Sequence, residues 1–88
     1  MEAGYNDAAH KAIQAVYDDP SLEQLADRLD ELLDLLDSDP TDPALHRGRM
    51  QSPRLWRVNV HGSGEDFTFL WDFTDSGQPW VHWAGPSF

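Results

Sequence analysis

Cysteine is absent from this chain of 88 residues. The fold therefore has neither a disulfide nor a thiolate metal site, and its core must be built from leucines and aromatic side chains. Long apolar runs are absent too, because no stretch approaches the roughly 18 residues of a membrane span. The opening residues, MEAGYND, have neither the basic start nor the apolar stretch of a signal peptide. These absences predict one soluble, cytoplasmic domain spanning 1–88, without a membrane partner.

Positive charge is scarce and unevenly placed. Six Lys and Arg against 16 Asp and Glu give a formal net charge of -10. This balance argues against binding nucleic acid through the whole surface, because Lys and Arg supply most of the attraction to phosphates. No acidic residue lies between Pro43 and Gly64, however, and this window holds four arginines, Arg47, Arg49, Arg54 and Arg57. The sequence therefore predicts a polarised molecule with one basic region.

Two helices are predicted in the N-terminal half. Apolar residues recur at helical spacing from Asp7, a candidate N-cap, until Asp18-Asp19-Pro20 ends the pattern. Asp19 or Ser21 is then expected to cap a second helix, with Pro20 tolerated in its first turn.

Leucines step by three and four from Leu22 to Leu36 in this second helix, and acidic residues line its outer side. The leucine stripe favours core packing over a coiled-coil seam, because barely two heptads are too few for a persuasive coiled coil. The two Asp-Pro pairs in 38–43 must end the helix.

Three strands are predicted after 44–52, a segment expected to be a loop with room for one helical turn. Residues 55–61 and 67–73 alternate with period two, and Gly62-Ser63-Gly64 joins them as a hairpin turn. The sensible register places the apolar residues of both strands on one face. A third strand follows at 80–84, and 3–5 can form a short edge strand. This order predicts an α+β fold with two N-terminal helices packed on a three- or four-stranded antiparallel sheet.

The polar face of the hairpin is the best candidate site. Arg57 and His61 share this face, and together with His82 they can position a phosphodiester and transfer protons near neutral pH. The structural alternative is that Arg57 only pairs across the strands with Asp72. A metal site is not expected, because no pair of histidines has zinc-motif spacing, and no cofactor motif is present.

Several segments together resemble the RelE/ParE toxin superfamily of bacterial toxin-antitoxin systems. They are the leucine-rich helix, Asp39-Pro40-Thr41-Asp42-Pro43, Arg47-Gly48-Arg49-Met50, Leu55-Trp56-Arg57-Val58-Asn59-Val60, Phe69-Leu70-Trp71-Asp72 and His82-Trp83-Ala84-Gly85-Pro86. The resemblance implies two N-terminal helices on an antiparallel sheet and a cognate antitoxin as partner. It also implies either mRNA cleavage in the ribosome, as in the RelE branch, or action on DNA gyrase, as in the ParE branch.

The resemblance assigns roles by position. Arg57 corresponds to a basic residue on the first hairpin strand, and His82 lies where family members often carry a catalytic arginine. Arg47, Arg49 and Arg54 would form the basic approach that binds substrate. Lysines are missing from this region, and the C-terminal tyrosine of some members is replaced by a chain ending at Phe88.

Two functions are consistent with these residues. The first is a RelE-like ribonuclease toxin in which Arg57, His61 and His82 are catalytic and the ribosome and mRNA are partners. The second is a toxin-fold protein without hydrolytic chemistry that acts by binding a protein partner through the same face.

Overall fold

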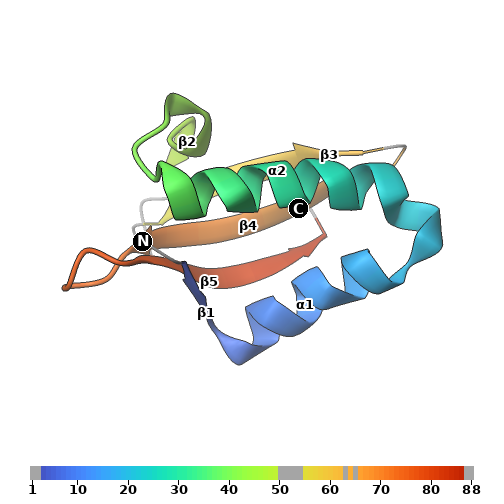
Figure 1. The fold of residues 1–88 in the computed structure, drawn as a ribbon, viewed down its shortest axis with the longest axis horizontal. Coiled ribbons are helices and arrows are strands. Elements are labelled where there is room, and N and C mark those ends of the chain that lie inside the picture. Colours follow the sequence, from blue (N-terminus) through green and yellow to red (C-terminus); the bar gives the residue numbers. More distant parts are fainter. Residues whose placement is uncertain (1–2, 50–54, 63, 65, 87–88) are drawn as a thin grey trace.

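The structure is a computed structural model that describes residues 3–49, 55–62, 64 and 66–86. It is an α+β fold in which two helices lie on one face of a sheet (Figure 1). The helical elements are α1 (Asp7–Asp18), the 3-10 turn η1 (Pro20–Leu22), α2 (Glu23–Ser38) and the 3-10 turn η2 (Pro43–Leu45). The strands are β1 (Gly4–Tyr5), β2 (Gly48–Arg49), β3 (Trp56–His61), β4 (Asp66–Phe73) and β5 (Pro79–Pro86).

The sheet has five strands in the order β1-β5-β4-β3-β2, and β1 runs parallel to β5. The prediction of three or four antiparallel strands is therefore wrong in number and in direction, although β2 to β5 are antiparallel. The short edge strand expected at 3–5 is present as β1, whereas the two-residue edge β2 lies where no strand was expected. Two residues are too few to show a period of two, so tertiary contacts decide whether such edges form.

Asn6 fixes β1 and the start of α1 against β5. Its backbone N–H donates to the carbonyl of Val81 (3.0 Å), and its side-chain amide donates to the carbonyl of His82 (2.9 Å). The indole Nε1 of Trp80 donates to Asn6 Oδ1 over 2.7 Å. Asn6 is the residue that precedes α1, and its side chain makes no capping bond to the helix. The predicted N-cap, Asp7, is instead the first helical residue.

The break between the two helices agrees with the prediction. Asp19 accepts hydrogen bonds from the backbone N–H (3.0 Å) and the hydroxyl (2.7 Å) of Ser21, and these donors hold its pKa below the usual value. Pro20 occupies the first position of η1. The second helix therefore begins with a 3-10 turn, and regular α-helix starts at Glu23.

The hairpin has the predicted register. Trp56 pairs with Trp71 and Val58 with Phe69, so their apolar side chains share the face that packs on the helices. In β5 the register shifts opposite Leu70 and Trp71, which leaves His82 as the extra residue of a β-bulge. The predicted hairpin turn falls partly on Ser63, which lies outside the described residues.

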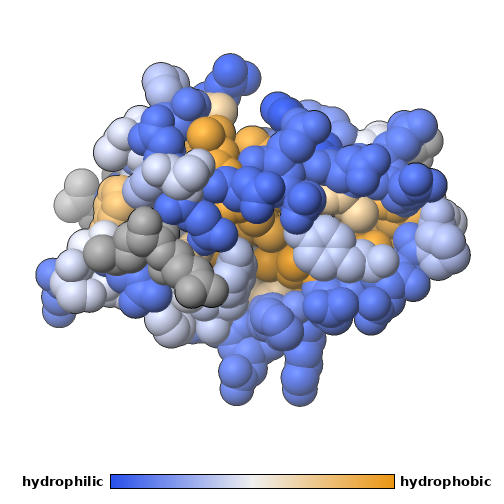
Figure 2. Space-filling view, in the orientation of Figure 1, coloured by the Kyte–Doolittle hydropathy of each residue, from blue (hydrophilic) through white to orange (hydrophobic). Residues whose placement is uncertain are grey.

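The core lies between the helices and the sheet. It takes the buried leucines of α2, namely Leu25, Leu29, Leu32, Leu33 and Leu36, so the prediction of core packing for this stripe is confirmed. Figure 2 shows the helical face mostly covered by hydrophilic side chains, with hydrophobic ones reaching the surface between the two helices. On the opposite face, no helix of the described residues covers the sheet, yet Thr68 and Leu70 are buried by their neighbours.

Candidate functional site

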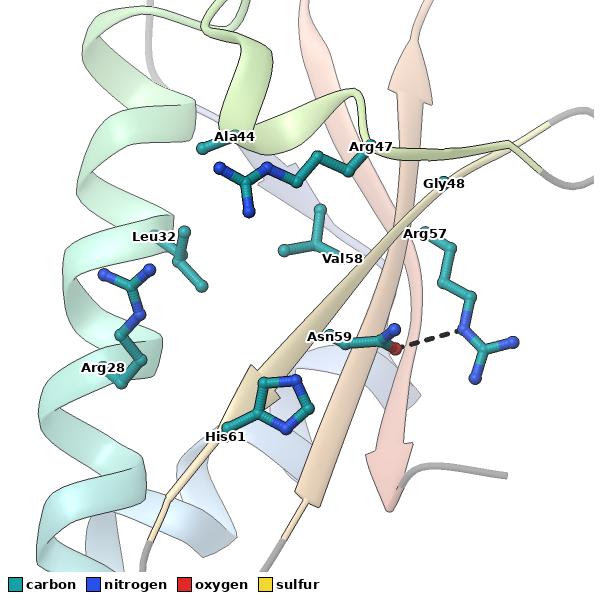
Figure 3. Close-up of a pocket in the computed structure, with 9 residues that line it drawn as sticks. All are labelled: Arg28, Leu32, Ala44, Arg47, Gly48, Arg57, Val58, Asn59 and His61. Atoms are coloured by element: carbon teal, nitrogen blue, oxygen red, sulfur yellow. Dashed lines mark hydrogen bonds between the residues drawn. The ribbon is translucent and has the colours of Figure 1, made fainter.

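A pocket of about 310 Å³ lies between α2, η2 and the outer edge of β3 (Figure 3). We call it the basic pocket, because three of the five arginines and one histidine line it. Its lining residues are Arg28, Leu32, Ala44, Arg47, Gly48, Arg57, Val58, Asn59 and His61. In a chain of net charge -10, this concentration of cations marks the surface that an anionic partner would approach.

The cations approach the strand from both of its sides. Figure 3 shows the guanidinium group of Arg47 in the space between α2 and β3 and that of Arg28 over the ribbon of α2, whereas Arg57 extends to the other side of β3. Arg28 is paired with Glu31 on the helix surface (2.9 Å). Arg47 is exposed and has no hydrogen bond or ion pair with the residues that the structure describes. Arg47 is therefore the cation of this pocket most available to a ligand.

A cluster of aromatic rings holds the segment that carries Arg47. His46 packs edge to face against Trp56 (4.4 Å between centroids) and Trp71 (5.3 Å), and its Nε2 lies 2.7 Å from the carbonyl of Pro40. The indole of Trp71 donates to the carbonyl of Leu45 over 3.1 Å. Edge-to-face rings and a satisfied indole N–H favour one arrangement of this loop. The sequence predicts a loop with one helical turn for this segment, and η2 is a turn at its start. The packing of the segment on the core positions Arg47.

Arg49 contacts the side chains of Trp56 and Asp72. Its guanidinium carbon lies 4.3 Å from the centroid of the Trp56 ring, and its Nη2 lies 3.8 Å from Asp72 Oδ2. The predicted substrate-binding set thus divides in the structure. Arg47 lines the basic pocket, Arg49 stacks and pairs outside it, and Arg54 lies outside the described residues. Asp72, which the structural alternative paired with Arg57, forms this ion pair with Arg49.

Asn59 anchors Arg57 on the far face of the sheet. Its Oδ1 accepts hydrogen bonds from Arg57 Nε (3.1 Å) and from the hydroxyl of Thr68 (2.9 Å). Thr68 is fully buried, so this arrangement satisfies its hydroxyl. The Arg57 side chain is consequently held along β3.

His61 is exposed at the end of β3, where its Nδ1 lies 2.9 Å from Asp66 Oδ1. It shares a strand face with Arg57, but four residues of strand separate their Cα atoms by about 13 Å. His82 is also exposed, but it belongs to β5 and does not line the basic pocket. Since β4 separates β3 from β5, two strand spacings of about 4.8 Å lie between them. The three predicted catalytic residues therefore do not form one contact cluster.

Arg28 was missed by the sequence analysis. It is the single basic residue in α2, among the acidic residues of the outer side, and the helix turn that carries Leu32 into the core also directs Arg28 to the pocket rim. That isolated cation was the signal available in the sequence. Whether this arginine would line a pocket depended on which element packs beside the helix.

A second, acidic groove lies between α1 and α2, lined by Tyr5, His10, Ile13, Gln14, Tyr17, Asp30, Leu33, Asp34 and Asp37. The Tyr17 hydroxyl donates to Asp30 over 3.3 Å. Burial and then the charge of Asp30 raise the pKa of Tyr17 to about 12. Residues of α2 line both the groove and the basic pocket. The helix presents acidic side chains to the groove and Arg28 to the pocket, so the uneven charge expected from the sequence also separates two sides of α2.

Across 3–49, 55–62, 64 and 66–86, no three His, Asp or Glu side chains gather as a metal site. None of the helices described there is long and apolar enough to cross a bilayer. Comparison of the chain with protein-family models, with curated proteins and with solved structures gives no match.

Proposed function

We propose that this protein is a RelE/ParE-like toxin-fold protein that acts by binding an anionic segment of a protein partner through the basic pocket, without hydrolysis. The observation that carries the proposal is the convergence of Arg28, Arg47 and Arg57 on one pocket in a strongly acidic chain. Opposite charge steers a partner to this surface, and the acidic remainder of the molecule repels it elsewhere. A cognate antitoxin is the partner that the resemblance suggests.

The positions of the predicted catalytic residues support binding over cleavage. General acid–base chemistry needs groups that reach the same reacting atoms. Here Arg57 is held by Asn59, and His82 is two strands away from the basic pocket. Guanidinium groups on both sides of β3 suit recognition of several carboxylates along a chain.

A polyglutamate peptide tests the proposal. Replacing both Arg28 and Arg47 by Gln should weaken its binding about tenfold and reduce its salt dependence, because two pocket charges are lost. Lys11→Gln is the matched control, since Lys11 is exposed on α1, away from the pocket. Equal binding by the parent, the double variant and the control would disprove an anion-binding role for the pocket.

The second candidate is a RelE-like, ribosome-dependent mRNA endoribonuclease. It is favoured by His61, an exposed imidazole in the basic pocket that is paired with a carboxylate, an arrangement suited to proton transfer. If it holds, expression arrests growth, Arg57→Ala abolishes the arrest, and His82→Ala lowers cleavage. Absence of both growth arrest and mRNA cleavage in a ribosome-containing extract would remove this candidate and leave the binding function in place.

A further inference from the structure

The outer edge of β3 is only partly paired. β2 pairs with Trp56 and Arg57 alone, through Arg49 and Gly48. Residues 58–61 have β4 on one side and no strand among the described residues on the other. Because alternate residues of a strand direct their N–H and C=O groups to opposite neighbours, two of these four residues present both groups to the open edge. Such an edge is a template for a further strand.

The basic pocket lies along this open edge. At one end the edge is closed by α2, since a methyl group on Gly62 would lie 2.7 Å from the Cα of Leu25. At the other end Gly48 and Arg47 bound the pocket. The opening between these two ends runs along Val58 to His61, which is the length of β3 that lacks a partner strand.

We infer that an extended acidic peptide segment of the partner adds to the sheet as a strand along residues 58–61 of β3. This inference rests on the proposed function and deepens it. Side chains of an added strand would alternate between the two faces of the sheet. On one face they meet Arg28 and Arg47, and on the other they meet Arg57 and His61. Carboxylates on either face of the added strand would therefore lie near a guanidinium group.

The charge distribution identifies this occupant among the alternatives. A second copy of this chain, paired edge to edge through β3, would bring two sets of pocket arginines together, and like charges oppose that association. A nucleic acid would use its phosphates on the arginines but offers no peptide groups to the edge of β3. An acidic extended peptide satisfies both the charges and the backbone groups.

Backbone methylation of a peptide separates strand addition from simple charge attraction. The probe is a fluorescent peptide of about ten residues in which Glu, Val and Thr occur on both alternating faces, long enough to cover the edge. Two methylated forms carry N-methyl groups on odd or on even amides. In an added strand only one set of amides faces β3. One methylated form should therefore bind about tenfold more weakly and the other about as well as the parent peptide.

Hydrogen exchange of the protein gives a second, independent readout. Binding of the unmodified peptide should slow amide exchange at two alternate residues of 58–61, because these amides acquire a bonded partner. If both methylated peptides bind like the parent and exchange at 58–61 is unchanged, strand addition is wrong. Loss of polyglutamate binding in the Arg28→Gln, Arg47→Gln variant would then still support the proposed function. A single-stranded RNA of equal charge that binds as tightly as the peptide would also overturn the inference.

Discussion

The indole Nε1 of Trp71 donates a hydrogen bond of 3.1 Å to the backbone carbonyl of Leu45, joining the central strand to the turn that precedes Arg47. Both residues are fully buried. The hydrogen bond holds η2 against β4, the central strand of the sheet. The position of a basic pocket residue therefore depends on a group in the core.

Trp71→Phe should lower the free energy of unfolding by about 1–3 kcal/mol, because the Leu45 carbonyl loses its donor in a buried place. Binding of polyglutamate should weaken as well, since the Arg47 segment is less firmly held. Urea denaturation measures the first effect and fluorescence titration the second. Trp83→Phe is the control, because Trp83 is 37% exposed and should give a clearly smaller loss of stability.

Leu29→Ala should cost about 2–5 kcal/mol, because Leu29 is fully buried where α2 packs on the sheet and its truncation leaves a cavity. This is a large part of the stability of a domain of this size. Leu35→Ala, at a half-buried position of the same helix, should cost clearly less. Equal urea midpoints for both variants would contradict the packing described for α2.

Gly62→Ala should destabilise the fold by about 1–3 kcal/mol through overpacking. Its new methyl group would lie 2.7 Å from the Cα and Cβ of Leu25, so α2 and the end of β3 must separate. Gly77→Asn is the comparison, since Gly77 has a φ of 86° with open space around it, and Asn tolerates that conformation better than most residues. Thermal unfolding should show a larger decrease in melting temperature for the Gly62 variant than for the Gly77 variant. The opposite order would mean that α2 does not approach this turn closely.

Tyr17 predicts how stability changes in alkaline solution. Burial, with the charge of Asp30, raises the pKa of Tyr17 from 10.0 to about 12, so the neutral phenol is favoured in the folded state. The corresponding stability is fully present below pH 10, and it is lost as the pH rises through the folded pKa. Tyr17→Phe has no phenol to ionise and should lose less stability between pH 10 and pH 12. Parallel curves for the two proteins in urea titrations would refute this assignment.

Several features of the fold could be predicted from the sequence because they are local. The leucine spacing from Leu22 to Leu36 specifies a helix with one buried stripe, and the alternation of the hairpin strands specifies a buried face. The capping role of Asp19 is local in the same way, since its partner is two residues away. The concentration of arginines in 47–57 of an acidic chain also followed from the sequence, because the order of residues shows it without any tertiary contact.

Only the tertiary structure decided which of those charges act together. Arg47 and Arg49 are two residues apart, yet one lines the basic pocket and the other stacks on Trp56 and pairs with Asp72. Arg28 joined the pocket because α2 packs beside β3, and His82 was separated from it because β4 lies between their strands. The edge strands β1 and β2 have too few residues for any sequence period, so their pairing depends on distant partners such as Trp80. Periodicity determines which face of an element is buried, but the contacts between elements determine which exposed groups become neighbours.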